Sequence, residues 1–212
     1  MISPNKLIGS LVYRTRAALN SNQAFKEELA QYTYSPNCLV DDEFLFWHYP
    51  GTHNEISRNL LEIGKHVNGS RVKFPAILNF QAIRQEKSGE DVKLVYNLAI
   101  VGSVLSEWTT EQREVQVFDR LLRPIYVEFM SQIRKAGYFH LNYGNPPHTY
   151  YEIFTTGNDA RIMNRYGEFV DAIELHNLTL KLRENLCKRD YTRIETENAL
   201  VTKDINNLLK LL

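Results

Sequence analysis

The chain has 212 residues, 43% of them hydrophobic and 24% charged, with 25 basic and 25 acidic residues. This ordinary globular composition can bury a substantial core without metals or disulfides, and its zero formal charge argues against a protein whose main task is to coat nucleic acid. No apolar run reaches the roughly 20 residues of a membrane helix, and the start lacks a signal-peptide pattern, so we expect a soluble, cytosolic chain.

The first third of the chain is predicted to be mainly helical. Ser3 can cap a helix and Pro4 suits its first turn, so we expect a helix over residues 4–31 that "NSN" at 20–22 interrupts. An aromatic run, "EFLFWHY", could form a strand over residues 43–49. Helical spacing returns in "EISRNLLEIGKHV", which we expect to end near Gly69.

Two strand-like segments then form a predicted antiparallel hairpin. "KFPAILNFQAIRQE" alternates between apolar and polar residues, and "VKLVYNLAIVGSV" is apolar on both faces. The polar turn "KSGED" joins them, and a short loop with glycine between two such runs is typical of a hairpin. Apolar residues on both faces indicate central strands that are covered on both sides.

The segment "WTTEQREVQVFDRLLRPIYVEFMSQIRKAG" is the strongest predicted helix. Thr109 and Gln112 have the spacing of a capping box, a broad apolar stripe follows, and Gly137 marks the end. Pro124 lies inside this pattern, so we expect a kink or break near residues 120–123.

Residues 138–154 are rich in aromatic side chains and turn residues. Such a segment could stack nucleobases or sugars, or fill a core or a subunit contact. Because lysine and arginine do not alternate with the aromatic residues, a subunit contact is favoured over the stacking of nucleobases or sugars. Tyr150 and Tyr151 are therefore candidate subunit-contact residues.

The segment "DAIELHNLTLKLR" at residues 171–183 alternates like a strand but changes phase in its middle. Two interpretations remain open. A β-bulge near His176–Asn177 would keep one core face throughout. Alternatively, the second half presents its leucines to a neighbouring subunit. The candidate contact residues under this second interpretation are Leu178, Leu180 and Leu182.

Residues 184–212 are predicted to form a separate arm, helical in its second half. Such an arm can dock on a partner or close onto its own domain, and the sequence favours neither. Its apolar residues have roughly helical spacing. The candidate contact residues in the arm are Ile205, Leu208, Leu209 and Leu212.

The histidines and cysteines predict no active site. His48 and His53 flank "YPGT" near acidic residues, but their spacing matches no metal-ligand pattern, and surface loop histidines are favoured. His176 is expected to be structural. Cys38 and Cys187 have no metal or catalytic spacing and are expected to be buried free thiols.

Other catalytic patterns are also missing from the sequence. His140 and His148 bracket a predicted turn with ordinary polar residues. Glu86 and Asp91 lie near a strand, as in metal-dependent nucleases, but the ExK element that such sites need is lacking. The chain has neither a phosphate-binding glycine loop nor a nucleophile elbow. We therefore expect a non-enzymatic chain without a cofactor or a metal.

Three segments, in their order along the chain, are similar to segments of known proteins. They are "KFPAILNFQAIRQE", "LVYNLAIVGSVLSEWTTEQREVQVFDRLLRPIYVEFMSQI" and "DAIELHNLTLKLR". Together they resemble the tail terminator (tail completion) and neck-ring (head–tail connector) proteins of tailed bacteriophages, especially those of Bacteroidetes phages including the crAss-like group. The resemblance covers residues 1–183, with an aromatic insert at about 34–70. It implies an α+β fold with a mixed or antiparallel sheet and helices packed on one face. The predicted helical arm, residues 184–212, lies outside it.

The resemblance also implies a function. Copies would form a closed six- or twelve-fold ring in the virion neck or tail, assembled in the host bacterial cytoplasm. The ring would join or terminate the tail at the portal or connector, contact the adjacent portal and tail proteins, and surround a channel through which genomic DNA passes without sequence-specific binding. It implies no catalysis and no membrane. Two alternatives stay open: a phage-encoded metal-dependent nuclease built around His48 and His53, and a generic cytosolic α/β adaptor.

Overall fold

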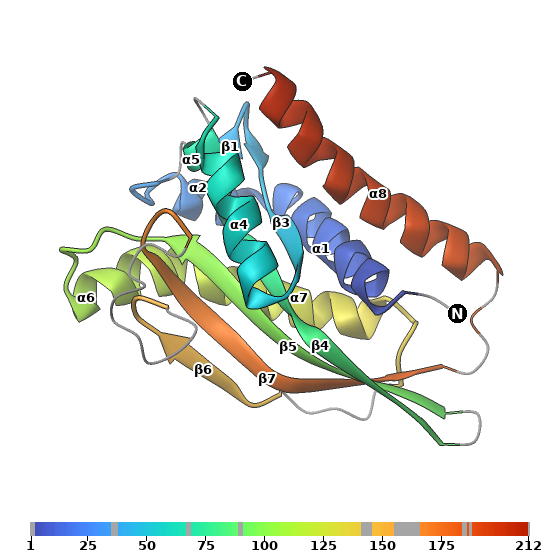
Figure 1. Cartoon of the computed structure of the whole chain (residues 1–212). Helices are drawn as coiled ribbons and strands as arrows, with labels where there is room; N and C mark the ends of the chain where they lie inside the picture. Colours follow the sequence, from blue (N-terminus) through green and yellow to red (C-terminus); the bar gives the residue numbers. More distant parts are fainter. Residues whose placement is uncertain are drawn as a thin grey trace.

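A five-stranded mixed sheet organises the computed structural model (Figure 1). The structure describes residues 3–34, 38–66, 69–88, 91–140, 146–154, 166–183, 186 and 188–211. The helices within these ranges are α1 (Pro4–Asn20), α2 (Gln23–Leu29), α4 (His53–Gly64), α5 (Gly69–Val72), α6 (Thr110–Arg113), the π-helix η1 (Glu114–Leu122), α7 (Arg123–Lys135) and α8 (Lys188–Leu211). The strands are β1 (Leu39–Val40), β2 (Glu43–Phe44), β3 (Trp47–Gly51), β4 (Ala76–Ser88), β5 (Asp91–Ser103), β6 (His148–Tyr151) and β7 (Val170–Leu182).

The strands of the main sheet follow the order β3-β4-β5-β7-β6. β3 runs parallel to β4, and the other neighbouring pairs are antiparallel. β1 and β2 form a separate two-stranded antiparallel ladder. The predicted α+β class with a mixed sheet and a C-terminal helix is confirmed, as is the hairpin of β4 and β5.

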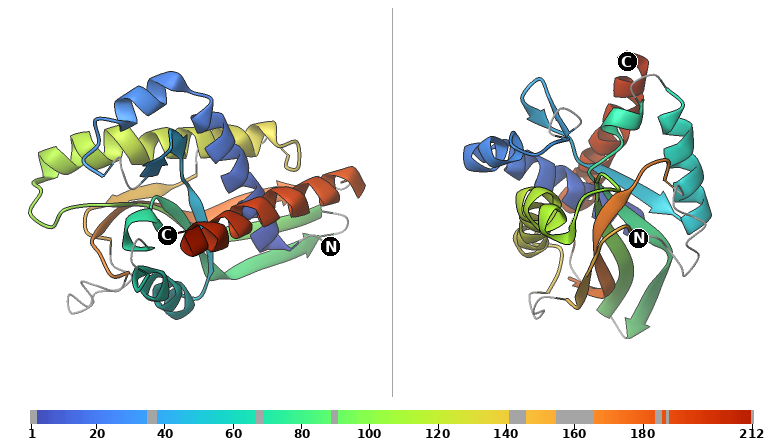
Figure 2. Two further views of the ribbon diagram at one scale, coloured as in Figure 1. Left: turned by 90° about the horizontal axis from the view of Figure 1, so that it is seen from above. Right: turned by 90° about the vertical axis from the view of Figure 1, so that its left-hand side faces the viewer.

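Helices cover both faces of the sheet, as the apolar pattern of the hairpin predicts. On one face, α1, η1 and α7 pack on the larger core, which includes Leu98, Ile100 and Ile173 of the central strands. On the other face, α4 packs on a second core around Leu78 and Val101. The right-hand view of Figure 2 shows α7 and α4 on opposite sides of the strands. α4 therefore adds helical cover beyond the face that the resemblance implies.

The N-terminal elements begin and end at residues with clear local causes. "NSN" separates α1 from α2, and the side chain of Asn22 accepts the Phe25 N–H to cap α2. The predicted strand over residues 43–49 is divided, because pairing with β4 begins only at Trp47. Thr52 and Glu55 form a capping box that starts α4, which ends at Gly64, earlier than predicted.

The break expected near Pro124 is a change of helix type, and the backbone stays helical from Thr110 to Lys135. The capping box of Thr109 and Gln112 begins α6. The chain then widens into the π-helix η1, and α7 resumes α-helical geometry at Arg123. Proline has no N–H to donate and its ring crowds the preceding turn, so regular α-helical bonding cannot continue through this position.

A β-bulge accounts for the phase change in β7. The register of β5 and β7 shifts so that His176 and Asn177 together face the single residue Asn97. Asn177 has a φ of 50°, in the left-handed region, and its backbone N–H donates to Asn97 Oδ1 at 3.0 Å. The extra residue returns Leu178 to the face of Leu175, and both belong to the larger core. The bulge interpretation is confirmed.

The same bulge corrects the alternative interpretation of the second half of β7. Leu178 and Leu180 are only 2% and 1% exposed, inside the core of their own chain. Leu182 is partly buried and packs against that core. These leucines were candidate subunit contacts because an unbroken strand would turn them outward, but the bulge turns them inward.

The described part of α8 packs along α1 of the same chain. Glu197 accepts hydrogen bonds from Ser10 (2.5 Å) and Arg14 (2.9 Å). Ile194 and Val201 of α8 are buried in the larger core. The predicted arm therefore closes onto its own domain over these residues.

Candidate subunit-contact surface

The two edges of the main sheet differ in exposure. At one edge, the side chains of Trp47, His48 and Tyr49 in β3 are buried, and α1, α4 and α8 all contact the strand. At the other edge, β6 is exposed over three of its four residues and pairs only with β7 in the part of the chain that the structure describes. An exposed edge strand offers unpaired backbone groups to another chain. β6 is therefore the open edge.

Tyr150 lies on the face of the sheet that η1 and α7 cover, and β6 pairs it there with Ile173. Its ring meets the ring of Phe118 edge to face, with centroids 5.4 Å apart. The guanidinium of Arg123 lies 5.2 Å from the centroid of the same ring. Although 43% exposed, Tyr150 is thus held by neighbours from η1 and α7. A side chain already fixed in this way loses little conformational entropy when a partner binds.

Tyr151 points to the opposite face of the same strand, because consecutive side chains in a strand alternate. Its ring centroid lies 5.5 Å from that of Phe154, and the residue is 36% exposed. The two tyrosines predicted as contact residues are therefore both exposed, one on each face of the open edge.

An apolar and charged ridge of η1 and α7 continues the surface beyond Tyr150. Val115 and Val127 are 43% and 63% exposed. Between them, Arg123 forms ion pairs with Asp119 and, at 2.5 Å, with Glu114. Tyrosine and arginine are enriched in protein–protein interfaces, and a rim of charges around apolar groups is typical of them.

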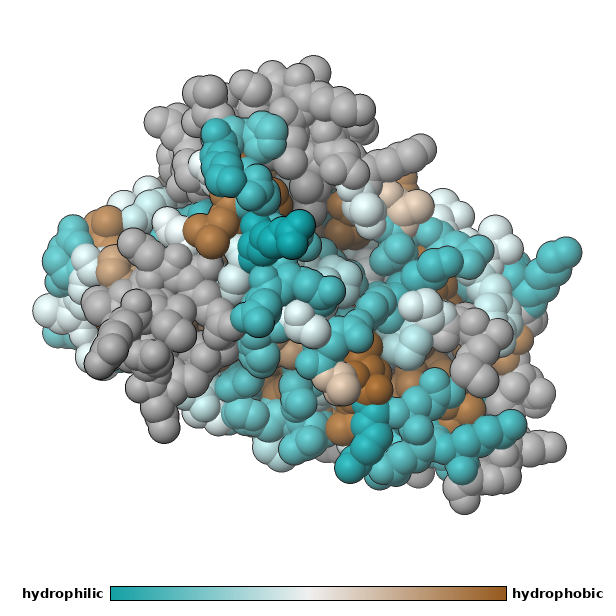
Figure 3. Space-filling model, in the orientation of Figure 1, coloured by the Kyte–Doolittle hydropathy of each residue, from teal (hydrophilic) through white to brown (hydrophobic). Residues whose placement is uncertain are grey.

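Hydropathy on the face of the molecule seen in Figure 1 is mixed. Figure 3 shows the described hydrophobic residues there in small groups among hydrophilic ones. A contact on such a surface depends on a few anchoring side chains rather than on bulk apolar area.

A buried ion pair stabilises the part of the fold that lies next to β6. Arg113 Nη1 donates to Asp171 Oδ1 at 2.6 Å, and the two side chains are 2% and 0% exposed. The same Asp171 oxygen accepts the backbone N–H of Ile153, just after β6. Arg113 also donates to the carbonyls of Leu105 and Ser106. Sequence reasoning missed this pair, although a lone aspartate at the start of an apolar strand is a signal that could have found it.

The prediction that His48 and His53 are surface loop histidines is wrong, because they belong to β3 and α4. His48 is buried in β3, where its Nε2 lies 3.2 Å from Asn79 Nδ2, and burial lowers the pKa of its imidazole to about 3. His53 begins α4 and lies against the ring of Phe80, with centroids 4.2 Å apart. Among the described residues, no group of three or more His, Cys, Asp or Glu side chains could hold a metal ion.

Two of the remaining histidines take part in local packing or pairing. His148 belongs to β6 and packs against Tyr126, with ring centroids 4.8 Å apart, and so extends the tyrosine surface. His176 lies at the bulge and pairs with Glu174 at 3.4 Å. The backbone N–H of His140 donates to the carbonyl of Lys181.

Cys38 is buried, as predicted, and burial raises the pKa of its thiol to about 12. A thiol with so high a pKa is a poor nucleophile. Cys187 lies outside the described residues.

The arm contributes no described contact residue. The backbone of α8 runs to Leu211, but the side chains of Ile205, Leu208 and Leu209, and all of Leu212, lie outside the described part of the chain. Over the residues that the structure does describe, no helix is both long and apolar enough to cross a membrane.

No family model, no curated protein and no solved structure matches this chain. The arguments for its function therefore rest on its own sequence and structure.

Proposed function

We propose that the chain is a structural virion protein of a tailed bacteriophage, which forms a closed ring in the neck or tail. The ring joins or terminates the tail at the portal or connector and surrounds the DNA channel. The order of the elements supports this proposal through the resemblance given above. The observation that carries it is the open edge of β6, with Tyr150 and Tyr151 exposed on its two faces.

The contact between copies is heterologous. A ring forms when one surface of each copy meets a different surface of the next and the rotation between them closes. In this proposal, β6 and the neighbouring ridge around Arg123 make one of the two surfaces. A stable contact of this kind buries about 800 Å² on each partner. Both tyrosines then act as anchors at the centre of the contact.

The charge of the chain suits a channel protein. Its 25 basic and 25 acidic residues balance, so the ring as a whole attracts DNA only weakly. Genomic DNA can then pass through the lumen without sequence-specific binding. The adjacent portal, connector and tail proteins are the other partners, and the ring has six or twelve copies, as the resemblance implies.

The test replaces both exposed tyrosines with aspartate, because a contact that buries an unpaired carboxylate is unfavourable. The Tyr150→Asp/Tyr151→Asp protein and the wild type are compared by size-exclusion chromatography with light scattering and by negative-stain electron microscopy. Each is measured alone and mixed with the portal and tail proteins encoded beside it. We expect the wild type to form rings, alone or on its neighbour, and the variant to stay monomeric with an unchanged circular dichroism spectrum.

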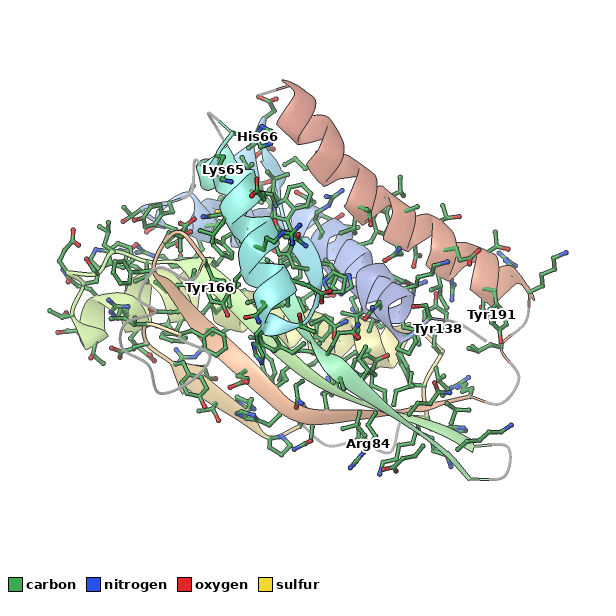
Figure 4. The ribbon with its side chains drawn as sticks, in the orientation of Figure 1. Lys65, His66, Arg84, Tyr138, Tyr166 and Tyr191 are labelled. Atoms are coloured by element: carbon green, nitrogen blue, oxygen red, sulfur yellow. The ribbon has the colours of Figure 1, made fainter. Side chains whose placement is uncertain are left out.

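Tyr191→Asp is the matched control. Tyr191 is 37% exposed, close to the value for Tyr151, but it belongs to α8, far from β6 (Figure 4). It should leave ring formation unchanged. Rings formed equally well by all three proteins would refute the role of β6. A wild type that stays monomeric in every mixture and cleaves DNA with Mg²⁺ would refute the ring and favour the nuclease alternative.

A further inference from the structure

A cavity of about 520 Å³ lies between α1, β3, α4 and α8, away from the β6 surface. Ligand sites commonly have volumes of about 300–1,000 Å³. Polar side chains from four separate elements line it, and so does His66, which lies just beyond the end of α4 (Figure 4). The lining residues on which the inference rests are Asn5, His48, Pro50, Asn59, Ile63 and Asn198.

One wall of the cavity contains side chains that are hydrogen-bonded to one another. Asn79 Nδ2 donates to Asn5 Oδ1 at 3.1 Å and lies 3.2 Å from His48 Nε2. With Nε2 as the acceptor, the ring proton of His48 lies on Nδ1. Burial keeps this imidazole neutral, because it lowers the pKa to about 3. The wall therefore presents groups that are polar and uncharged.

Gly9 lets α8 complete the cavity. A Cβ placed on Gly9 would lie 2.0 Å from Asn198 Oδ1 and 3.2 Å from His48 Nδ1. Any other residue would push Asn198 away, so glycine is what allows this amide to lie against α1 beside His48. Across the cavity, Asn59 projects from α4. Neither the Asn59 nor the Asn198 side-chain amide has a hydrogen-bond partner among the described residues.

The charged side chains at the cavity form ion pairs within the chain. Lys6 pairs with Glu195 at 2.9 Å, and Glu62 pairs with Lys65 at 2.7 Å. A charged ligand would therefore compete with these internal pairs. A purely apolar ligand would remove water from the amides without replacing their hydrogen bonds, which is unfavourable. The cavity fits a neutral ligand that both donates and accepts hydrogen bonds.

We propose that this cavity binds a neutral mono- or disaccharide. Each sugar hydroxyl donates and accepts, as each asparagine amide does, while Pro50 and Ile63 offer apolar surface to the C–H groups of a sugar ring. A nucleobase would need an aromatic face on which to stack. Tyr49 does not supply it, because its ring is buried and its hydroxyl is bound to the Lys73 carbonyl at 3.2 Å.

The test is an NMR titration of the full ¹⁵N-labelled chain. The probes are N-acetylglucosamine and maltose, with adenosine and glucuronate as comparators. We expect at least one neutral sugar to shift the side-chain amide signals of Asn59 and Asn198 saturably, and neither comparator to do so. Asn59→Ala and Asn198→Ala should each weaken binding about fivefold, the usual effect of losing one neutral hydrogen bond. Asn54→Ala, on the same helix but outside the cavity, should bind normally.

Three outcomes would overturn the proposal. The first is the absence of a saturable shift from either sugar at concentrations of tens of millimolar. The second is unchanged sugar affinity in both cavity variants. The third is saturable binding of adenosine in place of the sugars, which would assign the cavity to a nucleobase. Asn59 is exposed on α4, so its replacement leaves the fold intact and keeps the comparison valid. The outcome is independent of ring formation.

Discussion

Deleting His176 and Asn177 together tests whether the bulge sets the register of β7. These two residues share the position opposite Asn97, so removing Asn177 alone would leave a regular strand with Leu178 still opposite Tyr96. Removing both places Leu178 opposite Asn97 and turns every later residue of the strand to the other face. The double deletion therefore turns Leu178 and Leu180 away from the core and exchanges them for two polar side chains, Thr179 and Lys181.

The burial of the two leucines gives the magnitude. They are 2% and 1% exposed, so almost all of their side-chain surface would return to water. At about 1.5–3 kcal/mol for each buried leucine, the free energy of unfolding should fall by about 3–6 kcal/mol, before any cost of burying Lys181. This is a large part of the 5–15 kcal/mol that is typical of a folded domain.

Urea denaturation monitored by circular dichroism measures the effect. With a slope of about 2 kcal/mol per molar urea, the midpoint should fall by about 1.5–3 M. Asn177→Gly is the control, because glycine accepts a positive φ and keeps the length of the strand. Its midpoint should stay close to that of the wild type. A deletion variant whose midpoint also stays within about 0.5 M would refute the reasoning.

Three further predictions concern buried groups. Leu180→Asp places a carboxylate in the core and should unfold the chain or lower its urea midpoint by more than 1 M, rather than block assembly of a folded monomer. His48 is neutral in the fold, whereas the unfolded chain protonates it below its ordinary pKa of 6.5, so stability should fall with pH between about 6.5 and 3. From pH 7 to pH 5 this loss is about 2 kcal/mol, and His48→Gln should remove it from a plot of unfolding free energy against pH. Arg113→Met should cost about 3–5 kcal/mol in denaturant melts by leaving Asp171 buried without its cation, and adding Asp171→Leu should restore part of that loss.

Local signals in the sequence predicted a large part of the fold. The capping box at Thr109 and the strand at residues 170–182 depend on neighbours within a few positions, and both are confirmed. Near Pro124 the backbone stays helical and only the type of helix changes, at Arg123. The early end of α4 and the division of the strand at residues 43–49 were missed. Strand pairing with β4, which no local pattern contains, decides the second of these.

The candidate contact residues show where sequence reasoning reached its limit. The phase change in β7 allowed both a bulge and an outward-facing half, and only pairing with β5 distinguishes them. Arg113 and Asp171 are distant in sequence, so neither residue identifies the other. The exposure of Tyr150 and Tyr151 likewise depends on β6 being the last strand of the sheet, which follows from topology and not from composition.

The free strand edges of the sheet determine how copies can associate through backbone pairing. In the described part of the chain, β6 pairs only with β7 and leaves one edge free. Among the same residues, β3 pairs with β4 only over Ala76–Phe80, so the outer half of β4 leaves a second edge free on the opposite side of the sheet. Two different edges allow a heterologous strand pairing, in which β6 of one copy meets β4 of the next. A ring that closes through such pairs occupies both edges of every copy and leaves none for further strand addition.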